Sequence, residues 1–269
     1  MSHRARKRFG QNFLHDPGVI RRIVQAINPQ PGQRLVEIGP GKGALTLPLL
    51  QACGRLDVVE LDRDLIEPLA QKAAALGELV IHQADALRFD FSQLGGDGKL
   101  RVVGNLPYNI STPLLFHLLE QSDHIQDMHF MLQKEVVERM AAGPGSGDYG
   151  RLSVMIQYRC EVAPLFRVGP GAFNPAPRVE SAVVRLTPRP VPPARVDDYD
   201  SLAAVVRQAF AQRRKTLRNA LAGLLAEAAI RASGNDPSAR AETLSLQQYA
   251  ALANALARRD AGDGTHANL

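Results

Sequence analysis

The sequence predicts an α/β fold, in which a mostly parallel sheet of seven strands is covered by helices and followed by a small α-helical domain. From residue 34 to 133, short apolar runs alternate with amphipathic stretches, which is typical of parallel strands joined by helices. Four prolines between Pro188 and Pro193 then interrupt the pattern, because proline continues neither a helix nor a central strand. Beyond them, residues 198–258 are rich in Ala and Leu and have a helical period.

Short apolar runs mark the candidate strands. Five of them lie in the alternating region, at 34–39, 56–61, 79–85, 100–106 and 128–132. Two later runs, 152–162 and 179–186, are expected to add an antiparallel edge to the parallel part of the sheet. The amphipathic stretches between the strands predict helices near 43–53, 62–76, 111–120 and 134–141. A glycine-rich run at 143–147 predicts a flexible loop.

These patterns divide the chain into three parts. Residues 1–187 are expected to form the α/β domain, which begins with a basic arm at about 1–11. Residues 188–197 form a stiff proline-rich linker. The remainder, 198–269, is expected to be a small helical domain.

Composition excludes several classes of protein. Hydrophobic residues make up 45% and charged residues 22%, as in ordinary globular domains. A bilayer span needs roughly 18 consecutive apolar residues, and no run approaches that length. No apolar segment follows the basic start, so we expect neither a secretory signal nor an association with a membrane. We expect the protein to be cytoplasmic. Cys53 and Cys160 are expected to be small buried apolar groups, with no disulfide and no metal site.

The positive charge is concentrated in two segments, although the net charge of the chain is only +5. Residues 1–10 and 205–220 each hold a cluster of Arg and Lys with no acidic residue. On a helical wheel, Arg207, Arg214 and Arg218 fall on one stripe, which is expected to contact RNA phosphates. The alternative is a solvated flank of a helix that packs on the core.

A glycine-rich turn follows the first candidate strand, at Glu37–Gly43. Glycines at such a turn let the backbone approach a ligand closely. Gly39, Gly41 and Ala44 also satisfy the dinucleotide-binding pattern, and Glu60 follows at the distance of a ribose-binding carboxylate. The turn by itself therefore leaves a nicotinamide dinucleotide and S-adenosylmethionine both open.

Three features favour S-adenosylmethionine. Glu37, within the strand of the glycine motif, suits a cationic amino-acid end and would repel a pyrophosphate. Asp85 ends the third strand, where it can accept a hydrogen bond from an adenine amine. The third feature is Asn105–Tyr108, which reads Asn-Leu-Pro-Tyr and follows the fourth strand. The carboxyl ends of parallel strands share one edge, so these residues are expected to converge on one crevice.

The Asn-Leu-Pro-Tyr run suits chemistry at the exocyclic amine of adenine. The amine is a poor nucleophile, because its lone pair is delocalised into the ring. The Asn105 side-chain oxygen and a backbone carbonyl near Leu106 can accept its hydrogens, and Pro107 stiffens the turn. Tyr108 can stack on the base, and Phe173 is a candidate for its other face. The alternatives are an ordinary β-turn for the run and core packing for Phe173.

Six motifs in order resemble those of the ribosomal RNA adenine N6,N6-dimethyltransferases, and within them the bacterial small-subunit group. The motifs are 11–14 (QNFL), 37–41 (EIGPG), 59–62 (VELD), 105–111 (NLPYNIS), 173–181 (FNPAPRVES) and 212–218 (QRRKTLR). The resemblance spans about residues 4–260 and implies a Rossmann-like class I methyltransferase fold. It implies S-adenosyl-L-methionine as methyl donor, S-adenosylhomocysteine as product, and dimethylation of two adjacent adenines near the 3′ end of 16S rRNA.

The resemblance also implies an immature 30S particle as partner. We expect the enzyme to be a monomer. The residues that it implies for the cofactor pocket are Asn12, Leu14, Gly39, Glu60, Asp85 and Asn105. From the residues alone, Asp16 and Pro17 are also suited to begin a helix. A non-catalytic assembly factor would predict damage to the motifs, which are intact. Adenine in DNA or in large-subunit rRNA remains an alternative substrate.

Overall fold

The computed structural model describes residues 11–96 and 98–264. Two compact units make up the chain, Met1–Val137 with Glu161–Pro188, and Glu138–Cys160 with Arg189–Leu269. Residues 138–160, within the first domain expected from the sequence, therefore group with the C-terminal helices. The predicted basic arm lies outside the described residues, except for Gln11.

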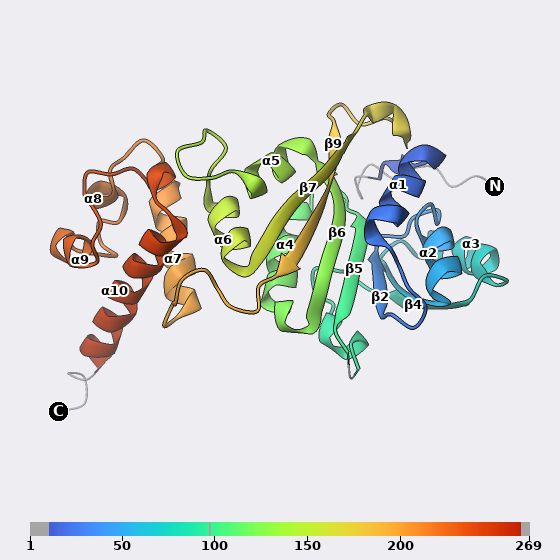
Figure 1. Cartoon of the computed structure of the whole chain (residues 1–269), viewed down its shortest axis with the longest axis horizontal. Coiled ribbons are helices and arrows are strands. Elements are labelled where there is room, and N and C mark those ends of the chain that lie inside the picture. The colour runs from blue at the N-terminus through green and yellow to red at the C-terminus, as the bar shows by residue number, and fades with distance from the viewer. Residues whose placement is uncertain (1–10, 97, 265–269) are drawn as a thin grey trace. The chain divides into compact units, whose positions relative to one another are not determined.

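The first unit is built on a seven-stranded sheet in the order β4-β3-β2-β5-β6-β9-β7 (Figure 1). The strands are β2 (Leu35–Ile38), β3 (Arg55–Glu60), β4 (Glu78–Gln83), β5 (Leu100–Asn105), β6 (Ile125–Gln133), β7 (Cys160–Val168) and β9 (Ser181–Pro188). The strands from β4 to β6 run parallel, and β9 pairs antiparallel with β6. The chain adds strands on opposite sides of β2, so a topological switch point lies between β2 and β5.

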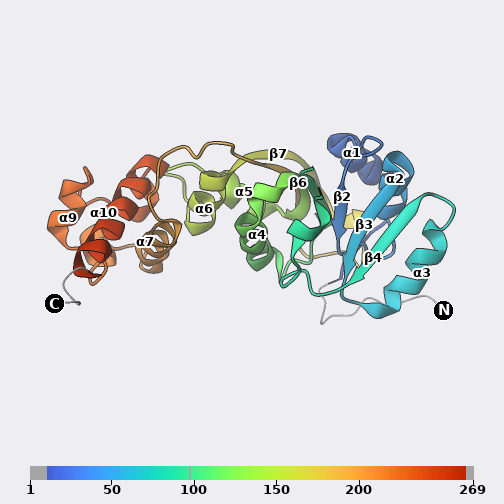
Figure 2. The ribbon, with the colours of Figure 1, turned by 90° about the horizontal axis from the view of Figure 1, so that it is seen from below.

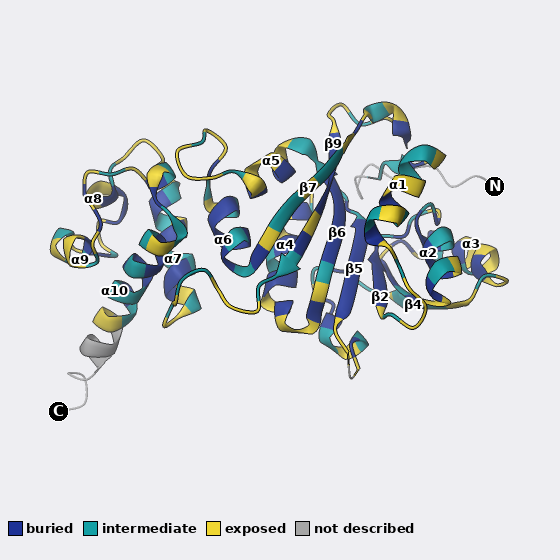
Figure 3. Cartoon of the chain, viewed as in Figure 1, coloured by how far each residue is buried: buried dark blue, intermediate teal, exposed yellow. Residues whose placement is uncertain are grey.

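Helices cover the sheet, whose strands β2 and β5 are almost wholly buried (Figure 3). The helices of this unit are α1 (Pro17–Ile27), α2 (Thr46–Cys53), α3 (Arg63–Ala73) and α4 (Ser111–Glu120), and the boundary between the units falls within α5 (Lys134–Ala141). Figure 2 shows α2 and α3 beside β2, β3 and β4. A buried apolar cluster joins α1 and α2 to the sheet, with Val103 and Met131 contributed by β5 and β6. This cluster packs against the strands on both sides of the switch point.

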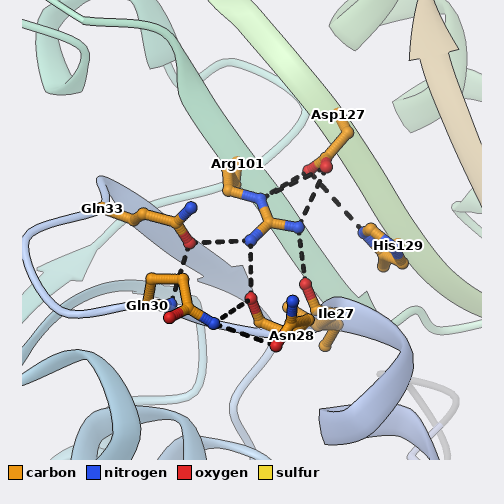
Figure 4. A network of polar contacts seen from close by, with 7 residues as sticks. All are labelled: Ile27, Asn28, Gln30, Gln33, Arg101, Asp127 and His129. Atoms are coloured by element: carbon orange, nitrogen blue, oxygen red, sulfur yellow. Dashed lines mark hydrogen bonds and ion pairs between the residues drawn. The ribbon is translucent and has the colours of Figure 1, made fainter.

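The helix α1 is held at both of its ends, and at the second end by a residue of β5. Asp16 caps its first turn by accepting from the amides of Gly18 and Val19, as the Asp-Pro sequence predicts. At the other end the guanidinium of Arg101 donates to the carbonyl of Ile27 over 2.6 Å and pairs with Asp127 (Figure 4). The positive charge satisfies carbonyls that a helix C-terminus leaves without partners.

A short strand pair lies outside the main sheet. Strand β1 (Phe13–Leu14) pairs antiparallel with β8 (Phe173–Asn174), and the amide of His15 extends the ladder to the Ala172 carbonyl. The sequence did not predict this pair, because two-residue strands carry no periodic signal. Its consequence is that the segment before α1 is held against the loop that precedes β9.

The predicted strand at 152–162 is wrong. Residues Arg151–Arg159 form the helix α6, and strand β7 starts only at Cys160. Apolar residues occur on several sides of this helix, and Ser153, Val154, Met155, Ile156 and Tyr158 are all buried. A segment buried all round has no clear helical period, so an apolar run of this length looks like a strand. The other six predicted strands agree with the structure to within a few residues.

The second unit is helical. After α6 and the linker it contains α7 (Tyr199–Ala211), α8 (Leu217–Ala220), α9 (Glu227–Ala232) and α10 (Leu246–Gly264). Its core holds two fully buried tyrosines, Tyr149 and Tyr249, whose hydroxyls donate to the carbonyls of Leu244 and Ala241. Phe210 packs between these rings at centroid distances of 6.2 and 5.9 Å. Within the described part of the chain, no helix is both long and apolar enough to span a bilayer.

Candidate functional site

A cavity of about 340 Å³ opens where β2, β3, β4 and β5 end. It lies at the switch point, the place at which open α/β sheets bind their ligands. Ten of the residues singled out from the sequence line it: Asn12, Leu14, Gly39, Gly41, Glu60, Asp85, Asn105, Leu106, Pro107 and Tyr108. Residues from five separate segments are thus brought to one place by the parallel topology.

The glycine loop is shaped so that a side chain would obstruct it. Gly41 has a φ of 57°, in the left-handed region that disfavours residues with a Cβ. A Cβ at this position would also lie 3.2 Å from the ring of Phe13. The ring packs against the loop and has the Lys42 ammonium 4.6 Å from its centroid. Gly41 therefore allows the segment around Phe13 to close one wall of the cavity.

Glu60, at the end of β3, is oriented by backbone amides. One carboxylate oxygen accepts from the amide of Asp62 over 2.8 Å, and the other from Gly41 over 3.3 Å. Burial raises the pKa of Glu60, while these two amides lower it. A carboxylate has about four lone-pair sites, so Glu60 keeps the capacity to accept from ligand hydroxyls.

Glu37, on β2, is a buried carboxyl on the cavity wall, with only 2% of its surface exposed. The hydroxyl of Thr46, in the first turn of α2, donates to it over 2.6 Å. Burial raises the pKa of Glu37 to about 8, against the opposing effect of the Thr46 hydrogen bond. A cationic ligand group beside it would favour the ionised form.

Asp85 follows β4 and accepts from the amide of Leu87 over 3.0 Å, which fixes the turn 84–87 on the cavity wall. The side chain of Leu61, on the same wall, is 51% exposed. An exposed apolar side chain beside a carboxylate suits a flat aromatic ligand that also carries an amine. Both residues directly follow strands, as the βα alternation predicts.

Asn105 ends β5 and joins two walls of the cavity. Its Nδ2 donates to the backbone carbonyl of Asn12 over 3.0 Å, across 93 positions of sequence. The amide oxygen Oδ1 is then the end of this side chain that can accept from an amine. Leu106 continues the strand ladder, because its amide donates to the carbonyl of Met131 over 3.2 Å. The run that starts at Asn105 is therefore hydrogen-bonded both to the segment around Asn12 and to β6.

Tyr108 is held at both its backbone and its side chain. Its carbonyl accepts from the hydroxyl of Ser111, in the first turn of α4, over 3.1 Å. Its phenol oxygen lies 2.6 Å from the hydroxyl oxygen of Ser181. Burial raises the pKa of the Tyr108 phenol, which therefore stays neutral. The ring forms part of the cavity wall in a fixed orientation.

Phe173 does not occupy the place expected from the sequence. It is only 3% exposed, belongs to the apolar cluster under α1 and does not line the cavity. Pairing of β8 with β1 turns it inward, opposite Leu14. Phe173 packs against the segment around Leu14 within the apolar cluster, and neither face of its ring is available to a base.

The predicted arginine stripe is also wrong, because no single helix carries it. The helix α7 ends at Ala211 and α8 begins at Leu217, so Arg214 lies in the turn between them. Gln212, with φ −132° and ψ 68°, leaves the helical backbone conformation, and the Arg213 side chain in the turn donates to the carbonyl of Tyr149 over 3.3 Å. Arg207, Arg214 and Arg218 are nevertheless all exposed, and Arg218 lies 3.6 Å from Glu227.

Three contributors to the site were missed from the sequence. Gly104 lies inside β5, where a Cβ would come within 2.7 Å of the Ile38 carbonyl oxygen. A glycine in the interior of a strand was the available signal. Thr46 was detectable as a hydroxyl in the first turn after a glycine loop. Ser181 ends the motif 173–181, but its role was missed because its contact with Tyr108 bridges 73 positions of sequence.

Comparison with known proteins identifies relatives of the whole chain. Residues 2–258 match the family model described as ribosomal RNA adenine dimethylase. Ribosomal RNA small subunit methyltransferase A of Pseudomonas putida is 62% identical, over 95% of this chain and 96% of its own length. Among solved structures, the 23S rRNA methyltransferase ErmE is 26% identical with a TM-score of 0.69, covering 91% of this chain and all of its own. A dimethyladenosine transferase from Plasmodium falciparum shares the fold, with a TM-score of 0.74 at 24% identity, over 89% of this chain and 95% of its own.

Proposed function

The chain belongs to the ribosomal RNA adenine dimethylase family, and from this premise we propose that it dimethylates the N6 atoms of two adjacent adenines in 16S rRNA. The target is the hairpin loop near the 3′ end, within the immature 30S particle. S-adenosylmethionine is the methyl donor. The observation that supports this most directly is the Asn105 amide, tied through Nδ2 to the segment around Asn12 at the edge of the cavity.

The chemistry of the cavity walls fits S-adenosylmethionine. Glu37 is a buried carboxyl suited to the cationic amino-acid end of the cofactor, and Glu60 has free acceptor capacity for ribose hydroxyls. Leu61 and Asp85 would hold the adenine ring, the first by apolar contact and the second by accepting from the amine. The backbone would approach the cofactor closely and contact it at four residues, Asn12, Leu14, Gly39 and Gly41. When bound, the cofactor supplies a methyl group on a sulfonium whose leaving group is a neutral thioether.

The protein residues act mainly by orienting the target amine. The Asn105 oxygen and a carbonyl near Leu106 accept the two amine hydrogens, which directs the nitrogen lone pair out of the purine ring. Pro107 restricts the turn that carries that carbonyl, and Tyr108 stacks on the base, a contact worth about 1–3 kcal/mol. No strong general base is required, because the methylated amine loses its proton readily to water.

Double methylation places a further demand on these residues. After the first transfer one amine hydrogen remains, so one of the two acceptors is left without a donor. The base must then be held more by stacking than by hydrogen bonds, and the wall formed by Tyr108 gains in importance. Phe173 is buried, so we assign this role to Tyr108, which lines the cavity in the same run as Asn105.

The C-terminal helical region is proposed to bind RNA through its exposed arginines. Arg207, Arg214 and Arg218 carry charge that phosphates would neutralise with release of counterions. We place the enzyme in the cytoplasm, where its substrate is assembled. We also propose a monomer, because Leu61, Val179 and Val191 are the large apolar side chains exposed within the described residues, too few for a stable dimer interface.

The test is methylation of 30S particles that lack these modifications. Incubation with labelled S-adenosylmethionine, followed by mapping of the modified nucleotides, should place dimethyladenosine at two adjacent positions of the 3′ hairpin loop. DNA and 23S rRNA are offered in parallel reactions, and label in either of them with none in 16S rRNA would overturn the proposed substrate. In a parallel titration, binding of a nicotinamide dinucleotide without binding of S-adenosylmethionine would overturn the proposed cofactor.

A further inference from the structure

Ser181 is a buried hydroxyl at the start of β9, in a part of the chain that carries none of the residues proposed to bind the cofactor. Its oxygen lies 2.6 Å from the phenol oxygen of Tyr108, on the far side of β6 from the end of β5. The run that follows β5 thus reaches across one strand to contact the next. A short link between the buried Ser181 hydroxyl and the half-buried Tyr108 phenol limits the positions that the ring can take.

We propose that Ser181 is a positioning residue for methyl transfer, which holds the Tyr108 ring as the wall against which the target adenine stacks. The inference rests on the proposed function, because it assumes that Tyr108 faces the base. Ser181 itself does not line the cavity and would act only through the tyrosine.

The position of Ser181 is itself fixed by the neighbouring strand. It lies opposite Gln133 in the β6–β9 ladder, and the next pair along the chain ties Lys134 to Glu180. The amide of Lys134 donates to the Glu180 carbonyl over 2.9 Å, and its ammonium reaches the Glu180 carboxylate, also over 2.9 Å. Lys134 at the same time begins α5. Two contacts therefore hold the start of β9 in place, so the Ser181 hydroxyl can fix the position of the Tyr108 side chain.

The arrangement assigns each end of Tyr108 a separate constraint. Ser111 holds the backbone carbonyl and Ser181 holds the phenol, so the ring is restrained along its whole length. Stacking depends on where the ring lies, and release of the phenol would let the outer end of the ring move away from the base. The second methyl transfer, in which the base keeps one amine hydrogen, is expected to be the more sensitive step.

The test is a double-mutant cycle with Ser181→Ala, Tyr108→Phe and the two combined. Each single variant removes the same link, so each should lower kcat on unmethylated 30S particles about tenfold and cause N6-monomethyladenosine to accumulate. The double variant should lose no more than either single variant, because the link is already broken. The Kd for S-adenosylmethionine should stay within about twofold of the wild-type value throughout.

A matched control is Ser153→Ala, which removes another fully buried serine hydroxyl, on α6 and bonded to the backbone of Arg139 and Gly150. It should lower Tm without changing the ratio of monomethyl to dimethyl product. If the losses in kcat of the two single variants multiply in the double variant, or if Ser181→Ala leaves the product ratio unchanged, the positioning role is overturned. Methylation by the wild-type chain would still support the proposed function in that case. Absence of adenine methylation by the wild-type chain would instead overturn the proposed function, and the role with it.

Discussion

At Asn105, one hydrogen bond decides which end of the amide can meet a substrate. The donor end is used on the Asn12 carbonyl, so the acceptor end remains for an amine. The sequence predicted Asn105 as an acceptor from its motif, but the partner that orients it could not be predicted. The two residues are 93 positions apart, and only the folded sheet brings the segment before α1 over the end of β5.

Glu37 makes the stability of the cofactor-free chain depend on pH. Its pKa is raised from 4.5 to about 8 by burial, so between these values the folded chain holds a proton that the unfolded chain has lost. Its contribution is therefore fully present below pH 4.5 and is lost as the pH rises through 8. We expect the free energy of unfolding of the wild-type chain to fall between pH 5 and 8 relative to Glu37→Gln, by on the order of 1 kcal/mol per pH unit.

Urea unfolding of both proteins at several pH values measures this difference. The Gln variant keeps a neutral side chain that can still accept from Thr46, so it is the matched reference. Parallel curves for the two proteins would show that Glu37 is already ionised in the folded chain. Addition of S-adenosylmethionine should reduce the difference, because a cation beside Glu37 stabilises its charged form.

At the scale of single elements, β5 determines where both ends of α1 lie. Arg101 and Asn105 are four positions apart, so their side chains emerge on the same face of the strand. Arg101 holds the last carbonyl of α1, and Asn105 holds the segment before it. Val103, on the same face between them, belongs to the apolar cluster that includes α1. One strand therefore positions the helix and the cavity segment together.

Gly104 permits the close approach of β5 to β2 beside the cavity. A Cβ there would lie 2.7 Å from the Ile38 carbonyl oxygen and 2.9 Å from a methyl carbon of Leu106. We expect Gly104→Ala to force the strands apart, to cost about 1–3 kcal/mol of stability and to weaken cofactor binding. Gly169→Ala is a suitable control, because nothing lies within 4 Å of a Cβ at that position. Equal Kd values for S-adenosylmethionine in Gly104→Ala and wild type would contradict this expectation.

The buried ion pair of Arg101 and Asp127 is the anchor whose removal should disturb α1. Both side chains are largely buried, at 7% and 13% exposure, and the Gln33 side chain also accepts from Arg101 over 2.8 Å. His129 lies 3.7 Å from Asp127, and burial lowers the pKa of this histidine to about 4, so it supplies no compensating charge at neutral pH. Arg101→Met should cost about 3–5 kcal/mol, because it leaves Asp127 buried and unpaired.

Denaturant unfolding tests the anchor, with Arg101→Met combined with Asp127→Leu as the comparison. Removing both charges should recover most of the stability that the single variant loses. If the double variant is as unstable as the single one, packing around α1 rather than the uncompensated charge explains the loss.

For the whole molecule, the sequence predicts the sheet well because βα units repeat. Each buried strand is a short apolar run, and each glycine or acidic residue after a strand falls at the same edge. Prediction failed where tertiary structure overrides a local period. The largely buried helix α6 resembled a strand, and the helix expected through residue 214 ends at Ala211, where Gln212 leaves the helical backbone conformation. Phe173 was misplaced because the pairing of β1 with β8 has no local signal.

The exposed arginines of the C-terminal helices give a prediction for binding of the whole particle. Reversal of charge in Arg214→Glu with Arg218→Glu should weaken RNA binding and lower the slope of log K against log salt by about 2, one for each phosphate that is no longer neutralised. Arg63→Glu, at an 83% exposed side chain on α3, is the control and should leave the slope nearly unchanged. An identical slope in the double variant would assign these arginines to a solvated surface.

The central claim is that Asn105, at the end of β5, orients the adenine amine for transfer. Single-turnover methylation of unmethylated 30S particles by Asn105→Ala, together with its Kd values for the particle and for S-adenosylmethionine, tests it most directly. We expect the transfer rate to fall by roughly 10²–10³, as when a hydrogen bond that stabilises a transition state is removed from an enzyme, while binding of the particle changes little. A transfer rate close to that of the wild-type chain, with dimethyladenosine still formed, would contradict this role for Asn105.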